Sequence, residues 1–180
     1  LKAEEELAQK AKLKAEEERK NGIEIETNLH PLKLVSFKQN TYIYNHIAII
    51  KSDSLGKTID LIGVDGNKPH YSENGNTLKV YKIRIDLNKK EISEEKIFEI
   101  KNSFRTTDIL YTKNGTIFIS YVARDDSGFF YLSVDKISFD GSKYININVF
   151  KSSSVPPPML VFQAGGKIVE GTDGSIFIAI

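Results

Sequence analysis

From residue 23 onward, apolar and polar residues alternate in short runs that are interrupted by turn dipeptides. A period of two is typical of a strand that buries one face, and such runs joined by two turn residues predict β-hairpins. The clearest case is "DILYTK NG TIFISY", because Asn114 and Gly115 can both adopt the positive φ of a two-residue type I′ turn. The pattern predicts a hairpin at this place.

The same arrangement recurs in "KIVEGT DG SIFIAI", around Asp173 and Gly174. Two further segments, "KISF DG SKYININVF" and "YKIRIDL NK KEISEEKIFEI", also predict hairpins. The turn signal of the second segment, NK, is weaker than the DG of the first. Consecutive hairpins predict an antiparallel sheet. The residues expected to share one face are Ile117, Ile119 and Tyr121 in the first hairpin and Ile176, Ile178 and Ile180 in the later copy.

The NG and DG hairpins lie 59 residues apart, and the runs "FFYLSVDKISF" and "YININVF" between them complete four strands before the pattern restarts. Four antiparallel strands in a repeat of about 40 to 60 residues are typical of a β-propeller blade. The chain therefore predicts an all-β fold, a partial β-propeller with blades at residues 42–101, 107–152 and 165–180. A propeller closes its ring, so further blades are expected beyond residue 180. A β-sandwich also uses many short strands and is the rival fold.

Residues 1–22 differ in character, because "LKAEEELAQKAKLKAEEERK" holds only good helix formers and Glu6 and Lys10 have favourable i,i+4 spacing. A charged helix is expected, closed by Asn21 and Gly22. The predicted organisation is thus a helix or spacer at 1–22 and a partial propeller domain at 23–180. The helix is interpreted as a solvated spacer or as a contact to an upstream domain, since both ends of the chain look truncated.

The composition of the chain argues against several classes of partner and site. Lysine and arginine number 25 against 24 acidic residues, and they are spread along the chain, which argues against nucleic acid as a partner. Apolar runs are too short for a membrane span, and without cysteine there is no disulfide or thiolate metal site. The histidines, His30, His46 and His70, lack metal-binding spacing, so no metal site is predicted and they are interpreted as ordinary polar or half-buried residues.

One family resemblance rests on "ISY" and on "GGKI" followed by "DGSIFIAI". In the order of these pieces, residues 104–180 resemble the second to third blade of the soluble glucose/sorbosone dehydrogenases that depend on pyrroloquinoline quinone, a family that includes aldose sugar dehydrogenases. The resemblance implies a six-bladed propeller, quinone and calcium as cofactors, and an aldose sugar or glycan as the small-molecule partner. It also implies a periplasmic or extracellular location.

Aligning this chain with the family on Gly165 and Gly166 puts Gln163 at the position of the family's general-base histidine and Lys167 at that of its arginine. A carboxamide does not accept a proton near neutral pH. The resemblance thus implies either a dehydrogenase whose base lies beyond residue 180 or one that has lost the reaction. Gln163, Gly165, Gly166 and Lys167 would then line a degenerate sugar or quinone pocket. The alternatives are a tight turn at the two glycines and, for the whole chain, a non-catalytic propeller that binds glycan or protein.

Overall fold

The computed structural model describes residues 6–14, 23–25, 32–34, 44–53, 55, 57–65, 76–156 and 165–180. The chain divides into two compact units, Leu1–Asn40 and Thr41–Ile180. The first unit contains a helix at residues 6–14, within the predicted span, and an antiparallel pair, β1 (Ile23–Ile25) and β2 (Leu32–Leu34). Asn21 and Gly22, the predicted helix end, lie outside the described residues. Within the described part of the chain, no helix has the length and apolar character needed to cross a membrane.

The second unit is an antiparallel β structure, as the sequence predicts. Seven strands pair in chain order in one open sheet, and two further strands form a separate hairpin. The strands of the sheet are β3 (Tyr44–Ser52), β4 (Thr58–Asp65), β5 (Asn76–Asp86), β6 (Glu91–Tyr111), β7 (Ile117–Arg124), β8 (Phe130–Phe139) and β9 (Tyr144–Lys151), and those of the hairpin are β10 (Lys167–Glu170) and β11 (Ile176–Ala179). All four predicted hairpins are confirmed as β5–β6, β6–β7, β8–β9 and β10–β11.

The type I′ prediction for the β6–β7 turn is wrong. Only Gly115 has a positive φ, of 84°, while Asn114 does not. The Thr112 amide donates to the Thr116 carbonyl at 2.9 Å, and the Gly115 amide donates to the Thr112 carbonyl at 3.0 Å. These bonds close a three-residue loop that needs one left-handed residue, and glycine supplies it. The β10–β11 turn repeats both bonds, with Gly174 also at a φ of 84°.

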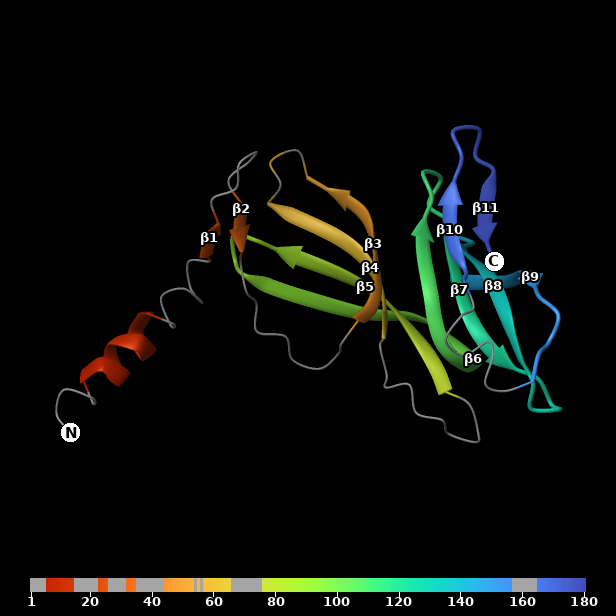
Figure 1. The fold of residues 1–180 in the computed structure, drawn as a ribbon. Helices are drawn as coiled ribbons and strands as arrows, with labels where there is room; N and C mark the ends of the chain where they lie inside the picture. The colour runs from red at the N-terminus through yellow and green to blue at the C-terminus, as the bar shows by residue number, and fades with distance from the viewer. Residues whose placement is uncertain are drawn as a thin grey trace. The chain divides into compact units, whose positions relative to one another are not determined.

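A bend in β6 divides the seven-stranded sheet into two halves, which Figure 1 shows side by side. Each half has four strands, because the first part of β6 belongs to one half and the last part to the other. The first part of β6 pairs with β5 and the last part with β7, and Ser103 has a partner on each side. Asn102, just before it, adopts a φ of 56°, a left-handed conformation that asparagine tolerates better than most residues. The buried Ser103 hydroxyl accepts the Leu78 amide at 3.2 Å and donates to the Ile100 carbonyl at 3.0 Å. These two bonds fix the bend, because they satisfy backbone groups there.

Apolar clusters lie on both faces of the β6–β9 half. One cluster combines Ile62 of β4 with Ile119 of β7 and is shared by the two halves of the sheet. Another combines Phe118 of β7 with Ile168 of β10, and Ile176 and Ile178 of β11 pack against it. Because neighbouring residues of a strand point to opposite faces, Phe118 and Ile119 mark two different cores. The second unit therefore has three layers, the two halves of the sheet and the β10–β11 hairpin.

Candidate functional site

β6 contacts one strand from each of the other two layers, β3 and β10. They bring together His46, Asp108 and Lys167, which we call the inner-strand site. The ladder between β6 and β7 shifts register between Thr106 and Asp108, so Thr107 is the extra residue of a bulge. Bulges of this kind redirect side chains and are frequent beside functional sites.

Asp108 is the anchor of the inner-strand site. Its side chain is 9% exposed, and it accepts a hydrogen bond from the backbone amide of Ile168 at 2.8 Å. The ammonium group of Lys167 lies 3.1 Å from the same carboxylate, while the lysine side chain is 70% exposed. A buried carboxylate needs such partners, because an unpaired charge is costly away from water. Asp108 therefore fixes the position of β10 relative to β6.

Beside Asp108, two hydroxyl groups form a series of hydrogen bonds that ends on the backbone of Gly166. The Thr107 hydroxyl donates to Ser120 Oγ at 2.7 Å, and the buried Ser120 hydroxyl donates to the Gly166 carbonyl. Gly166 has a φ of 89°, and a Cβ added to it would collide with the Thr107 hydroxyl. Gly165, with a φ of 52°, lies against the backbone of Ala179. Both glycines thus have backbone conformations that favour glycine, and their close neighbours are protein atoms.

His46 of β3 supplies a titratable group that is half-buried beside this anchor. Burial lowers its pKa below the ordinary value of 6.5, and the positive charges of Arg105 and Lys167 act in the same direction. The charge of Asp108 and a hydrogen bond to the Thr107 carbonyl oppose the shift in pKa without cancelling it. The imidazole is therefore neutral at neutral pH. Its Nδ1 atom is buried without a hydrogen-bond partner among the described residues.

The inner-strand site combines hydrogen-bond donors and acceptors in a small space. Lys167 has a largely exposed ammonium group with more protons than Asp108 uses, and His46 has one ring nitrogen still to be satisfied. A neutral imidazole can also accept a proton. The exposed ammonium group of Lys167 can therefore donate hydrogen bonds to a polar molecule, and His46 is a candidate base whose Nδ1 atom is buried.

The structure places three of the four sequence-predicted site residues here. Lys167 belongs to the inner-strand site, and Gly165 and Gly166 directly precede it in the chain, with Gly166 against Thr107. Gln163 lies outside the described residues. Sequence reasoning missed Asp108, although a carboxylate inside the apolar run "TTDILYT" was the available signal.

The interpretation of His46 as a half-buried residue is confirmed, whereas His30 and His70 lie outside the described residues. The proximity of His46 to Asp108 and Lys167 depends on the tertiary structure, so the spacing of the histidines in the sequence does not reveal it. The polar residues Asn45 and His46 at the start of the run "YNHIAII" were the only local signal.

Lowering the pH from about 7.5 to about 5.5 is expected to destabilise the protein in part through His46. Its pKa is lower in the folded protein than in the unfolded chain, so the unfolded state binds the proton first. The stability from the neutral imidazole is complete above a pH of about 6.5 and is lost as the pH falls through the folded pKa. Urea unfolding at both pH values should show a smaller loss in His46→Gln. Equal losses in the two proteins would contradict this assignment.

Comparison with protein-family models, with curated proteins and with solved structures gives no match to this chain.

Proposed function

We propose that Thr41–Ile180 forms consecutive four-stranded units of a β-propeller and binds a small sugar or similar polyol at the inner-strand site. The observation that carries this proposal is the meeting of β3, β6 and β10. In a propeller, the first strand of each unit lies at the central channel, beside the first strands of its neighbours. The contacts of β3 and β10 with β6 are consistent with such positions, and β6 runs from the first half of the sheet into the second without a break.

The arrangement of cores also supports a propeller over a sandwich. A two-sheet sandwich encloses one interior between its sheets. Here the β6–β9 half has one core toward β3–β5 and another toward the β10–β11 hairpin. Successive blades of a propeller pack in this way, with both faces of each blade covered by its neighbours.

The ligand class follows from the groups at the inner-strand site. Sugar hydroxyl groups accept hydrogen bonds as well as donate them, so they are matched by a site with a spare and exposed ammonium donor. Lys167 supplies this donor. Asp108 holds Lys167 in place through their ion pair.

A second candidate is oxidation of an aldose by a quinone, the chemistry that the family resemblance implies. His46 favours it, because its lowered pKa leaves the imidazole free to accept a proton at neutral pH. The described residues contain no cluster of three or more acidic, histidine or cysteine side chains that would hold calcium. We therefore derive no catalytic step through quinone or calcium.

Isothermal titration of the full chain with glucose and a panel of other aldoses and polyols tests the binding proposal. Binding is expected, and Lys167→Ala should weaken it about tenfold, the loss expected for a hydrogen bond from a charged group. Lys143→Ala, in the exposed β8–β9 turn, serves as the control and should bind like the unchanged protein. Absence of binding to every sugar, or equal affinity in Lys167→Ala, would overturn the proposal.

Addition of pyrroloquinoline quinone and calcium, followed by dye reduction with the same aldoses, tests the second candidate. Dye reduction that is lost in His46→Gln would support oxidation with His46 as the base. No absorbance change on adding quinone, together with no dye reduction, would reject oxidation and leave sugar binding as the function.

A further inference from the structure

A second polar site lies away from the inner-strand site, in the part of the sheet formed by β3, β4 and β5. The end of β3, the beginning of β4 and the end of β5 meet there because the strands are antiparallel. They surround a pocket of about 440 Å³, within the range of pockets that hold small molecules. We call it the Asp60 pocket, and its lining residues include Lys51, Asp53, Asp60, Arg84, Asp86 and Lys89.

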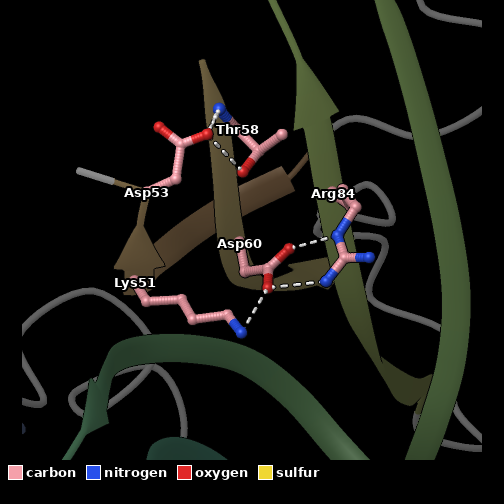
Figure 2. A network of polar contacts seen from close by, with 5 residues as sticks. All are labelled: Lys51, Asp53, Thr58, Asp60 and Arg84. Atoms are coloured by element: carbon pink, nitrogen blue, oxygen red, sulfur yellow. Dashed lines mark hydrogen bonds and ion pairs between the residues drawn. The ribbon is translucent and has the colours of Figure 1, made fainter. Parts of the chain in front are cut away.

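Asp60 and Arg84 form the base of this pocket. They are direct partners in the β4–β5 ladder, and Lys51 is the partner of Asp60 in the β3–β4 ladder. Arg84 donates from Nε to Asp60 Oδ1 at 2.7 Å and from Nη2 to Oδ2 at 3.0 Å, a two-pronged bond that Figure 2 shows. The carboxylate side chain is only 4% exposed. These bonds lower the pKa of Asp60 despite its burial, so Asp60 is ionised at neutral pH.

The positively charged side chains that line the pocket, Lys51, Arg84 and Lys89, have N–H groups that their contacts with the carboxylates do not use. A guanidinium group has five N–H bonds, and the two atoms of Arg84 that contact Asp60 use only part of them. The Arg84 side chain is 56% exposed, so its remaining edge is accessible. Lys51 lies 3.6 Å from Asp60, and Lys89 lies 4.0 Å from Asp86, both with side chains that are 69% exposed. Neither distance is that of a short hydrogen bond.

The carboxylates of the pocket are instead occupied by the protein itself. Asp53 accepts hydrogen bonds from the Leu55, Lys57 and Thr58 amides and from the Thr58 hydroxyl, the last of which Figure 2 shows. Burial acts to raise the pKa of Asp53, and these bonds outweigh it, so the pKa is lowered. Asp86 Oδ1 likewise accepts the Asn88 and Lys89 amides at 3.0 Å each.

An excess of unused donors therefore faces the pocket, although its formal charges are balanced. We infer that the Asp60 pocket binds a small molecule through an oxyanion group, a carboxylate or a phosphate. The exposed edge of the Arg84 guanidinium presents paired N–H donors to such a group, and Lys51 and Lys89 add charge from either side. Asp60 holds the guanidinium in position through the ion pair that Figure 2 shows. This inference does not depend on the proposed function.

Titration of the full chain with inorganic phosphate and with acetate, followed by NMR or calorimetry at low salt, tests the inference and separates the two sources of the oxyanion. Saturable binding of at least one of them is expected. The double variant Lys51→Gln, Lys89→Gln removes two exposed side chains that do not hold the fold, and it should bind the preferred anion at least about tenfold more weakly. Arg84→Lys keeps a positive charge beside Asp60 but loses the planar fork, and it should weaken the binding as well.

Lys143→Gln is the matched control, because it removes one exposed positive charge outside the pocket. Its affinity for the anion should stay within about twofold of that of the unchanged protein. Equal losses in the control and in the pocket variants would assign the binding to general surface charge and overturn the inference. Absence of saturable binding of both anions would overturn it too.

Discussion

Gly166→Ala is expected to lower the free energy of unfolding by about 2–5 kcal/mol, because it combines backbone strain with overpacking. The φ of 89° is a conformation that a residue with a Cβ adopts at a cost of about 1–2 kcal/mol. The added methyl group would also collide with the Thr107 hydroxyl and lie 3.0 Å from the Leu132 side chain. Relief of that collision has to move β10 away from β6, or disturb the bond between Thr107 and Ser120.

Gly174→Ala provides the matched control for this substitution. Gly174 has nearly the same φ, 84°, but a Cβ added to it meets no atom within 4 Å. It should therefore show the cost of strain alone, about 1–2 kcal/mol. Urea unfolding of the two variants and the unchanged chain measures the difference. Equal destabilisation in the two variants would contradict the close packing of Gly166 against β6.

Asp108→Ala is expected to destabilise the protein by about 2–4 kcal/mol, since it leaves the buried Ile168 amide without an acceptor and also opens a small cavity. Lys167→Ala should cost only about 0–1 kcal/mol, because the lysine side chain is 70% exposed and water screens its ion pair. Asp108→Asn should fall between them, as the carboxamide oxygen can still accept the Ile168 amide.

The order of these three effects in urea unfolding distinguishes two roles of Asp108. If the carboxylate mainly fixes β10 through the backbone bond, Asp108→Ala is the most damaging and Lys167→Ala the least. A loss in Lys167→Ala as large as that in Asp108→Ala would instead assign the stability to the ion pair. Near-ultraviolet circular dichroism of the tyrosines reports whether each variant retains the packed fold before its sugar binding is compared.

Local signals in the sequence accounted for the hairpins. An NG or DG pair flanked by alternating residues acts over about ten residues, and such signals do not depend on the rest of the fold. The type I′ assignment failed, because a two-residue and a three-residue loop both place glycine at a positive φ. The choice between them was made by the bonds of Thr112 and Thr116, which close the longer loop.

The restart of the pattern after four strands was also visible in the sequence. The predicted segments 42–101, 107–152 and 165–180 correspond closely to β3 to the first part of β6, the last part of β6 to β9, and the β10–β11 hairpin. The continuity of β6 was not predicted. It depends on Asn102 and Ser103, where a strand turns without ending, and neither residue is a strong turn signal by itself.

The sequence by itself determined four of the hairpins, their antiparallel pairing and the recurrence of one of them, because turn chemistry and alternation are properties of neighbouring residues. Only the tertiary structure decided which polar residues meet. Asp108 and Lys167 are 59 residues apart and Asp60 and Arg84 are 24 apart, and both pairs form through the register and packing of different strands. A shift of one residue in the β4–β5 register would turn Asp60 and Arg84 to opposite faces, and Asp108 meets Lys167 only because the β10–β11 hairpin packs against β6, so both sites depend on long-range contacts that no local pattern encodes.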